Sequence, residues 1–348
     1  RNAPAFPPSR ACKALLTNLP FSLTGAQRRV LLEIQHDLQQ PHPMQRLVQG
    51  DVGSGKTVIA ALAAIQAAEA GYQVAVMAPT EILAEQHRQA FNEWLEPLNI
   101  PTAFLNGRMK AAEKRFMLAQ IETGAAQVII GTHALFQEAV TFHKLGLVVI
   151  DEQHRFGVHQ RLSLHEKNNQ QDVHTHQLIM TATPIPRTLA MTAYGDLDLS
   201  VIDELPPGRK PIETAVLSNE KRFEVMQHLY AKCKEGMQAY WVCPLIEESE
   251  LLHAQAAEVT AIQFSEQWPD LRVGLIHGRL KGEQKALVMN AFKTHQLDLL
   301  VATTVIEVGV NVPNSSLMII ENAERLGLAQ LHQLRGRVGR GDKQSHCV

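Results

Sequence analysis

Cysteine is scarce in this chain, with four residues among 348, far apart in the sequence. They are Cys12, Cys233, Cys243 and Cys347, and their spacing matches neither a disulfide framework nor the C-x-x-C pattern of a zinc site. A chain that does not depend on disulfide bonds suits a reducing compartment. We therefore expect a protein of the reducing cytosol.

Long apolar runs are absent too. No stretch approaches the ~18 apolar residues of a membrane span, and the first residues lack the apolar core of a secretory signal. Neither sign of charge dominates, since 33 Lys and Arg face 35 Asp and Glu, which gives a net charge of −2. A global basic field for nucleic acid is thereby excluded. We expect a soluble protein with no membrane partner, whose contacts with any polyanion are local.

Short apolar runs rich in strand-forming residues are abundant, and helical patterns separate them. Strands that are buried on both faces and alternate with helices are typical of parallel α/β sheets. The ten runs, which suit two sheets better than one, cover residues 46–49, 74–78, 127–130, 147–150, 178–181, 214–217, 240–243, 273–276, 299–302 and 317–320. With 348 residues, 45% of them hydrophobic, the chain is long enough for two domains.

A proline-rich stretch separates the first five runs from the last five. Residues 203–211 (DELPPGRKP) cannot continue a helix or a central strand. We therefore expect one lobe over residues 1–204 and a second over residues 205–348, the second truncated at its C-terminus.

A weak internal repeat supports two lobes of one fold. The segment 106–110 (NGRMK) reappears at 277–281 (HGRLK), an offset of 171 residues, and the same offset sets 128–132 on 299–303. Repetition of this kind indicates tandem units. Chance similarity between two helix–strand units is the alternative, because βαβ units resemble one another in pattern.

A phosphate-binding motif follows the first expected strand. Residues 50–57 (GDVGSGKT) fill every fixed position of G-x-x-x-x-G-K-[ST], and an alanine-rich helical pattern follows them. Backbone N–H groups of such a loop converge on phosphate oxygens at the positive end of the helix. Lys56 is expected to neutralise the β- and γ-phosphates, and Thr57 to offer its hydroxyl to Mg²⁺. The residues expected to hold the nucleotide here are Gly50, Gly53, Ser54, Gly55, Lys56 and Thr57.

Two adjacent carboxylates, Asp151 and Glu152, end the strand expected at 147–150. Open α/β sheets bind ligands at the carboxyl ends of their strands. Asp151 is expected to hold Mg²⁺ and Glu152 to polarise the attacking water. A solvated turn is the alternative for the pair alone, and the phosphate-binding motif upstream argues against it. The predicted cofactors are therefore ATP and Mg²⁺.

The second lobe lacks a phosphate loop and has arginines instead. Residues 333–340 (QLRGRVGR) interleave three arginines with glycines, so guanidinium groups can approach a phosphate with little steric hindrance. We expect Arg337 and Arg340 to act as catalytic fingers on the nucleotide of the first lobe, with Gln333 also at the nucleotide. Hydrolysis would then require closure of the two lobes. An exposed basic turn is the alternative.

Taken together, these motifs resemble the superfamily 2 helicase motors, and within them the bacterial RecG family of ATP-dependent DNA helicases. The matching segments appear in family order from residue 21 onward, at 23–27 (LTGAQ), 50–57, 78–84 (APTEILA), 131–135 (GTHAL), 151–157 (DEQHRFG), 181–188 (TATPIPRT), 301–310 (VATTVIEVGV) and 321–340. The transcription-repair coupling translocases share the 181–188 pattern and are the alternative. One departure is Asn311, where the family usually has Asp.

The resemblance implies two tandem RecA-like P-loop NTPase lobes, each with a mostly parallel sheet flanked by helices. It assigns adenine recognition to Gln27, whose alternative role is to open a helix. The residues that resemble the loops gripping a DNA backbone, and that as isolated dipeptides would be ordinary helix N-caps, are Pro79, Thr80, Gly131, Thr132, Thr303 and Thr304. Those that resemble the relay between nucleotide state and lobe geometry are Gln153, His154, Thr181 and Thr183.

For function, the resemblance implies an ATP-dependent helicase or translocase that remodels branched DNA, such as stalled replication forks and Holliday junctions, in recombination and repair. We expect a monomeric motor in the bacterial cytoplasm, associated with the nucleoid, with branched or duplex DNA as its partner. The family's wedge domain lies N-terminal to the motor, and we expect this chain to be a part that lacks it. An RNA helicase is a rival hypothesis, because nothing in the sequence reads a 2′-hydroxyl. A nucleotide-gated scaffold without turnover is a further alternative, against which Glu152, Arg337 and Arg340 argue. A small-molecule kinase with a single lobe is another, against which the internal repeat argues.

Overall fold

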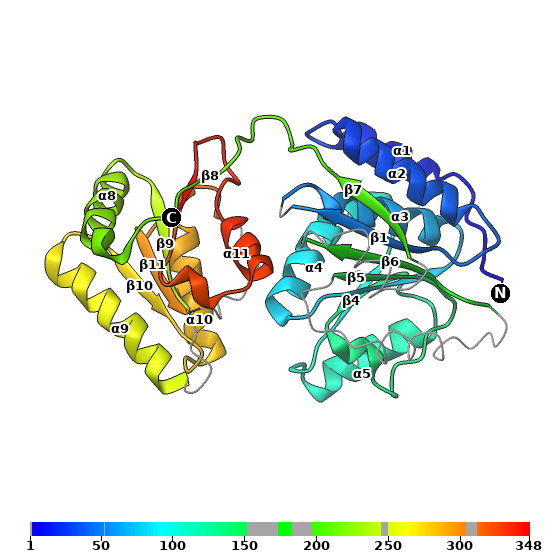
Figure 1. The fold of residues 1–348 in the computed structure, drawn as a ribbon. Helices are drawn as coiled ribbons and strands as arrows, with labels where there is room; N and C mark the ends of the chain where they lie inside the picture. Colours follow the sequence, from blue (N-terminus) through cyan, green and yellow to red (C-terminus); the bar gives the residue numbers. More distant parts are fainter. Residues whose placement is uncertain (1, 52, 152–172, 183–196, 245–249, 304–311) are drawn as a thin grey trace. The chain divides into compact units, whose positions relative to one another are not determined.

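The computed structural model describes residues 2–51, 53–151, 173–182, 197–244, 250–303 and 312–348. The chain divides into two compact units, Arg1–Pro206 and Pro207–Val348 (Figure 1), so the division falls inside the proline-rich stretch 203–211. Each unit has one parallel β-sheet with helices on both faces. The expected α/β class with two sheets is thereby confirmed.

Unit 1 contains a seven-stranded sheet in the order β3-β4-β2-β5-β6-β1-β7, and its described pairings are all parallel. The strands are β1 (Gln45–Gly50), β2 (Gln73–Met77), β3 (Thr102–Leu105), β4 (Val128–Gly131), β5 (Leu145–Asp151), β6 (His176–Thr181) and β7 (Asp198–Ile202). The helices are α1 (Arg10–Asn18), α2 (Gly25–Leu38), α3 (Lys56–Glu69), α4 (Glu81–Leu95), η1 (Glu96–Leu98), α5 (Ala111–Glu122) and η2 (His133–Phe136).

Apolar side chains on both faces of this sheet bury it between two helical layers. The strand β2 is buried along its whole length, with Val74 and Val76 on one face and Ala75 and Met77 on the other. Helices α1, α2, α3 and α4 cover the first face, and α5 with η2 covers the second. Helix α3 forms the centre of the first layer because its alanine-rich sequence is buried from Val58 to Ala68. This packing fixes the position of the loop that precedes α3.

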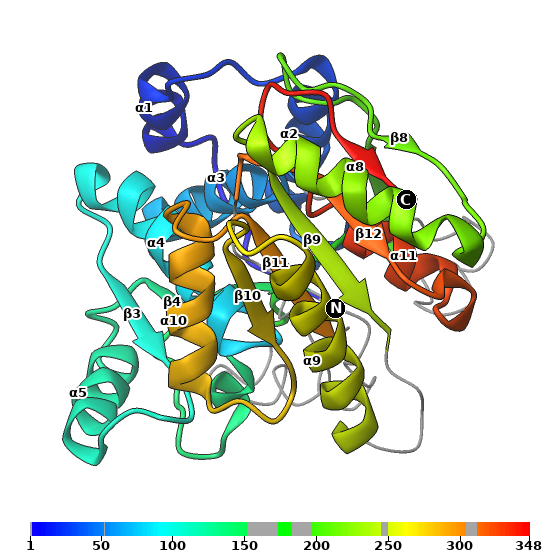
Figure 2. The ribbon, with the colours of Figure 1, turned by 90° about the vertical axis from the view of Figure 1, so that its left-hand side faces the viewer.

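Unit 2 contains a six-stranded sheet in the order β10-β11-β9-β12-β13-β8. Its strands are β8 (Glu213–Thr214), β9 (Gln238–Cys243), β10 (Val273–Ile276), β11 (Leu299–Thr303), β12 (Ser315–Ile320) and β13 (His346–Cys347), and its helices are η3 (Asn219–Lys221), α8 (Arg222–Lys234), α9 (Glu250–Gln267), α10 (Gly282–Lys293), η4 (Ala323–Arg325) and α11 (Leu328–Arg335). Helices α8 and α9 pack on one face, which is in the foreground of Figure 2. Helices α10 and α11 pack on the other face.

Three consecutive elements repeat between the units at a constant offset. In unit 1, β3, α5 and β4 begin at residues 102, 111 and 128, and in unit 2, β10, α10 and β11 begin at 273, 282 and 299. Each element therefore begins 171 residues after its counterpart. Both strand pairs are parallel neighbours in their sheets. The internal repeat predicted from the sequence is thus confirmed.

Some strands differ from the sequence prediction. The prediction of a strand at 214–217 is wrong beyond Thr214, since β8 ends there and Val216 is 95% exposed. The reason is that β8 pairs only with β13, which is two residues long. The strands β3, β7 and β13 are not among the runs expected from the sequence. They are short or mixed in polarity, so their apolar pattern is weak.

Candidate nucleotide and nucleic-acid site

Three neighbouring strands of unit 1 bring expected site residues to one edge of the sheet. Strand β5 pairs with β6, and β6 pairs with β1, in parallel. In that register Asp151 lies beside Met180, and Gln49 lies beside Thr181. The carboxyl ends of three adjacent strands therefore carry Asp151, which is expected to bind the metal ion, the buried Thr181 of the expected relay, and the start of the phosphate loop. Ligands bind at this edge in open α/β sheets.

The loop between β1 and α3 depends on glycines with positive φ. Gly53 has φ 79° and Gly55 has φ 93°, which residues with a side chain rarely adopt. A Cβ on Gly55 would also stand 2.2 Å from Nε2 of Gln27. Glycine at these positions lets the loop turn into the N-terminus of a 14-residue helix, where the helix dipole favours an anion.

Lys56 and Ser54 supply the polar side chains of this loop. Nζ of Lys56 donates to the carbonyl oxygens of Gly50 and Asp51, the second at 2.9 Å. The hydroxyl oxygen of Ser54 is buried and has no hydrogen-bond partner among the described residues. Thr57 follows in the first turn of α3 and is half-buried. An ammonium, a buried unpartnered hydroxyl and a helix N-terminus in one loop fit a phosphate group with a metal ion beside it.

Gln27 connects α2 to the phosphate loop. Its Oε1 accepts from the backbone N–H of Thr24 at 2.9 Å, which completes a capping box, and its Nε2 donates to the carbonyl oxygen of Ser54 at 2.6 Å. Gln27 is 3% exposed. Both ends of its amide are thus engaged within the chain, as the helix-opening alternative expects. Its role at adenine stays a prediction.

A histidine that the sequence analysis did not single out lies against Asp151. Nε2 of His87, on α4, is 2.7 Å from Oδ2 of Asp151. A signal for this contact exists in the sequence, because Ala84, His87 and Phe91 follow the three-to-four-residue spacing of the buried face of α4. A polar residue in such a stripe needs a buried partner.

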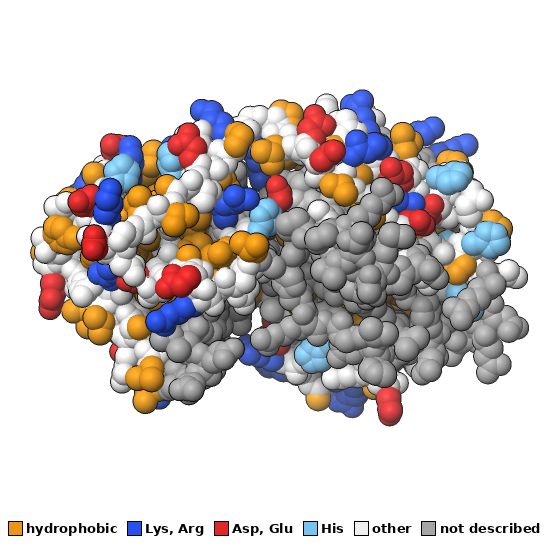
Figure 3. All heavy atoms as spheres, in the orientation of Figure 1, with side chains coloured by type: hydrophobic (Ala, Val, Ile, Leu, Met, Phe, Trp, Pro, Cys, Tyr) orange, Lys and Arg blue, Asp and Glu red, His pale blue; other side chains and the backbone are white. Residues whose placement is uncertain are grey.

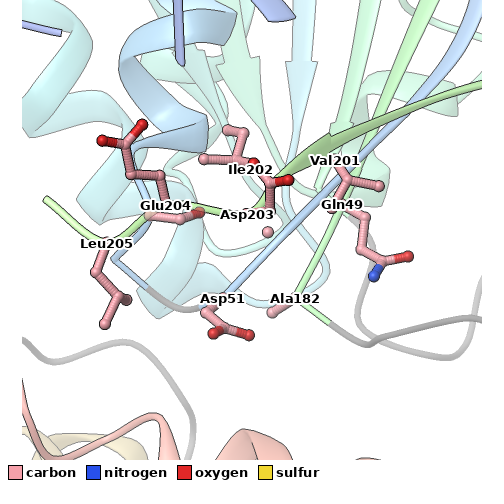
Figure 4. Close-up of a pocket in the computed structure, with 10 residues that line it drawn as sticks. Gln49, Asp51, Ala182, Val201, Ile202, Asp203, Glu204 and Leu205 are labelled. Atoms are coloured by element: carbon pink, nitrogen blue, oxygen red, sulfur yellow. The ribbon is translucent and has the colours of Figure 1, made fainter. Parts of the chain in front are cut away.

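A cavity of about 180 Å³ adjoins the phosphate loop (Figure 4). Its lining includes the carboxylates of Asp51, Asp203 and Glu204. Glu204 accepts from the backbone N–H of Ala26 at 3.0 Å, and Asp203 pairs with Arg29 at 3.1 Å, so the end of β7 is tied to α2. The cavity is acidic and smaller than the ~300 Å³ of an ordinary ligand pocket. The phosphate loop, and not this hollow, is therefore the anion site.

The loops expected to contact nucleic acid follow β2 and β4, which are paired neighbours. Pro79 and Thr80 are half-buried, and the Thr80 hydroxyl caps α4 by accepting from the N–H of Leu83 at 3.3 Å. Gly131 ends β4, and the 2% exposed Thr132 caps η2. The N-cap alternative is therefore seen in both loops. Contact with a DNA backbone stays a prediction for these residues.

The expected arginines of unit 2 differ in their surroundings. Arg337 is 2% exposed, and its Nε and Nη2 have no hydrogen-bond partner among the described residues. Burial, followed by the charge of Arg340, lowers the pKa of Arg337 to about 9. Arg340 donates from Nε to the carbonyl oxygen of Gly336 at 3.3 Å, and burial also lowers its pKa. The alternative of an exposed basic turn therefore does not hold for Arg337.

Two other expected site residues of unit 2 are placed by the structure. Gln333 is half-buried on α11, and Thr303 ends β11 with 1% exposure and no hydrogen-bond partner for its hydroxyl in the described part of the chain. The residues that lie outside the described ranges are Glu152, Gln153, His154, Thr183, Thr304 and Asn311. Within those ranges, no three His, Cys, Asp or Glu residues form a group suited to a metal ion, and none of the helices has the length and apolarity needed to cross a membrane.

Two family descriptions match the chain in the order of its two units. The DEAD/DEAH box helicase domain matches residues 24–192, and the helicase conserved C-terminal domain matches residues 221–342. The first match covers strands β1 to β6 of the sheet of unit 1, and the second covers strands β9 to β12 of the sheet of unit 2. The expected pair of RecA-like lobes is thereby confirmed.

Curated relatives are similar over nearly the whole chain. The ATP-dependent DNA helicase RecG of Escherichia coli (strain K12) is 62% identical over 335 residues, which are 96% of this chain and 48% of that protein. RecG of Streptococcus pneumoniae serotype 4 is 54% identical over 336 residues, which are 96% of this chain and 49% of that protein. The chain thus spans about half the length of the curated relatives that it matches.

Solved structures agree with this relationship. RecG bound to a three-way DNA junction has a TM-score of 0.82 and 43% identity, covering 99% of this chain and 45% of that chain. Dbp5 of S. cerevisiae bound to RNA and ADP BeF3 has a TM-score of 0.71, covering 97% of this chain and 86% of that chain, and at 17% identity it shows the fold alone. The chain therefore belongs to the helicases that combine these two domains, and over 96% of its length it is similar to the helicase core of RecG.

Proposed function

We propose that this chain is the ATP-driven motor of a helicase that remodels branched DNA. The observation that carries the proposal is the phosphate loop of unit 1, with Lys56 at the start of α3 and Asp151 two strands away at the same sheet edge. This arrangement suits the hydrolysis of a nucleoside triphosphate. The RecG relatives are ATP-dependent DNA helicases, which supports ATP as the nucleotide.

The chain's own groups divide the work at the nucleotide. Lys56 and the N–H groups at the start of α3 would bind the phosphates, and Glu152 would orient the attacking water. Thr57 and Asp151 would hold Mg²⁺, which when bound neutralises phosphate charge. Arg337 and Arg340 of unit 2 would stabilise charge on the transferring phosphoryl group. The buried, unpartnered guanidinium nitrogens of Arg337 support this role, because phosphate oxygens are strong acceptors for them.

DNA contacts are assigned to small loops at strand ends. The residues 79–80, 131–132 and 303–304 offer hydroxyls and backbone amides, which suit contacts with phosphates and carry no sequence preference. Figure 3 shows Lys and Arg side chains intermingled with Asp and Glu on the visible surface of unit 2, so a single-signed field is not the basis of binding there. The relay from nucleotide to lobes would run through Gln153, His154, Thr181 and Thr183.

The substrate class and setting follow from the RecG relationship. A solved RecG structure holds a three-way DNA junction, which supports branched DNA, such as stalled forks and Holliday junctions, as the substrate class. We propose that the chain acts as a monomer in the bacterial cytoplasm, in association with the nucleoid. We place its two lobes over residues 1–204 and 205–348. Translocation along duplex DNA, as in transcription-repair coupling, is the competing assignment that the substrate comparison below tests.

The test measures ATP hydrolysis by the chain and by its Lys56→Ala variant, without nucleic acid and with linear duplex, forked DNA or RNA. We expect stimulation by DNA to be weak in this chain, which spans about half the length of its RecG relatives, and to be larger with forked DNA than with linear duplex or RNA. The variant should lose on the order of 10³-fold or more, because the ammonium no longer stabilises the transferring phosphate. Circular dichroism of both proteins controls for folding. Full activity of the variant would refute the nucleotide site, and stimulation by linear duplex equal to that by forks would favour the translocase assignment.

A further inference from the structure

His87 makes a direct contact with the carboxylate assigned to the metal ion. Its Nε2–H donates to Oδ2 of Asp151 at 2.7 Å, and the two side chains are 7% and 22% exposed. The His87 ring also meets the ring of Phe91 edge-on, with centroids 6.3 Å apart. The imidazole is therefore held by packing on one side and by the carboxylate on the other. The contact engages Oδ2 of Asp151, and among the described residues no hydrogen bond to its Oδ1 is seen.

The helix that carries His87 begins at a loop assigned to DNA. Thr80 caps α4, and His87 follows seven residues later, which is about 10 Å along the helix axis. The buried face of α4 also contains Ala84, Phe91 and Leu95, all fully buried in the core of unit 1. A helix that is packed so closely moves as one element. A displacement at Thr80 would therefore reach the His87–Asp151 hydrogen bond.

We propose that His87 is a positioning residue that orients Asp151 toward the metal ion and links that carboxylate to the DNA-contacting end of α4. Groups that hydrogen-bond to a metal-ligating side chain fix its orientation, and their loss costs about 10–100-fold in metal affinity or activity. The inference rests on the proposed function, because it takes Asp151 as a metal ligand and the Thr80 loop as a DNA contact. It adds a connection between these two sites that does not pass through the relay residues.

The test compares His87→Phe, which keeps a ring of similar size without a donor, with His87→Gln, which keeps an N–H donor. Leu95→Val is the matched control, because it disturbs the same buried face of α4 two turns away from His87 and leaves both the hydrogen bond and the contact with Phe91 in place. The first measurement is the affinity for Mn²⁺, used as the probe for the Mg²⁺ site, by electron paramagnetic resonance in the presence of a non-hydrolysable ATP analogue. The second is the ratio of turnover with forked DNA to turnover without DNA, at saturating Mg²⁺.

We expect His87→Phe to weaken Mn²⁺ binding about tenfold and to lower the stimulation ratio by a similar factor. His87→Gln should recover part of both, and Leu95→Val should stay within about twofold of the wild type in both, even if its melting temperature falls. Wild-type values in His87→Phe, or equal losses in Leu95→Val, would overturn the inference alone. A wild-type chain that neither binds Mn²⁺ with the nucleotide nor hydrolyses ATP would overturn the proposed function and the inference with it.

Discussion

The two units share one framework and differ at one end of it. The strand orders β3-β4-β2-β5 in unit 1 and β10-β11-β9-β12 in unit 2 correspond element by element. Beyond them, unit 1 continues with β6-β1-β7, whereas unit 2 continues with the two-residue strands β13 and β8. The strands β1 and β6 are the ones that place the phosphate loop and Thr181 beside Asp151. The shared fold therefore provides no nucleotide site by itself, and the chemistry comes from what is attached to it.

The cationic side chains expected at the nucleotide differ between the two units in their hydrogen-bond partners. Lys56 in unit 1 donates to two backbone carbonyl oxygens, whereas Arg337 in unit 2 is buried with two guanidinium nitrogens unpartnered in the described residues. Burying an unpaired charge costs free energy. We therefore expect changes in the loop of unit 1 to act on nucleotide binding, and changes at the arginines of unit 2 to act on turnover and stability.

The largest expected effect separates binding from turnover. Arg340→Ala should slow ATP hydrolysis by on the order of 10³-fold, because an arginine that stabilises transition-state charge is lost. Its affinity for nucleotide should change by less than about threefold, because unit 1 holds the phosphates. Steady-state hydrolysis and titration with a fluorescent ATP analogue measure the two quantities. Equal losses in both would mean that unit 2 contributes to binding and that the division of labour between the units is wrong.

The reactivity of the buried cysteine thiols allows the burial of the two cores to be compared. Burial is the main cause that raises the pKa to about 11 for Cys12 in unit 1 and Cys347 in unit 2, and to about 12 for Cys233 and Cys243 in unit 2. Because only the thiolate reacts, the native chain at pH 8 should react with Ellman's reagent about 100-fold more slowly than the unfolded chain.

The pH dependence of that reaction has a definite sign. Since the native pKa values are raised, the rate should increase about tenfold per pH unit between pH 8 and pH 10. In urea, the thiol of unit 1 and the three of unit 2 should become reactive at different concentrations if the units unfold separately. A thiol that reacts in the native chain as fast as in the unfolded chain would contradict the burial that the structure shows for it.

A pair of glycine substitutions tests where backbone geometry matters in unit 1. Gly55→Ala should weaken nucleotide binding about tenfold or more, because φ is 93° there and the added Cβ would stand 2.2 Å from Nε2 of Gln27. Gly107→Ala is the matched control, since a Cβ at that position meets nothing within 4 Å and no positive φ is involved. Calorimetric titration with ADP measures both variants. A Gly55→Ala variant that binds as well as the control would show that the loop tolerates a side chain.

The smallest effect concerns stability in unit 2. Arg337→Met should raise the free energy of unfolding by about 1 kcal/mol or more, because an unpaired buried charge is replaced by an apolar side chain of similar length. Arg279→Met, at an exposed arginine of the same unit, should change it by less than about 0.5 kcal/mol. Urea denaturation followed by circular dichroism measures both. A less stable Arg337→Met variant would mean that the guanidinium has a partner that stabilises it.

The same substitution has a pH dependence that follows from the lowered pKa. Folding disfavours the charged form of Arg337, so the cost is fully present below pH 9 and is relieved as the pH rises above its native pKa of about 9. The stability difference between wild type and Arg337→Met should therefore shrink between pH 9 and pH 11. A difference that stays constant over that range would argue against an unpaired charge at this position.

Features that depend on local sequence were predictable, and those that depend on tertiary pairing were not. The phosphate loop needs only glycines, Lys56 and Thr57 in register, so the motif predicts its geometry. The strand expected at 214–217 ends early because its neighbour β13 is only two residues long, which the apolar pattern of the segment does not reveal. The contact between His87 and Asp151 joins residues 64 positions apart on different elements. Only the fold brings them together.

The first turn of α2 makes hydrogen bonds to two different segments of unit 1. On one side Gln27 is bonded to the backbone beside the nucleotide cradle, and on the other Ala26 is bonded to Glu204, two residues before the boundary at Pro206. The segment that leads from unit 1 into unit 2 is therefore bonded, through one helical turn, to the backbone of the phosphate loop. We expect a ligand that displaces the carbonyl oxygen of Ser54 to shift Glu204 through that turn as well.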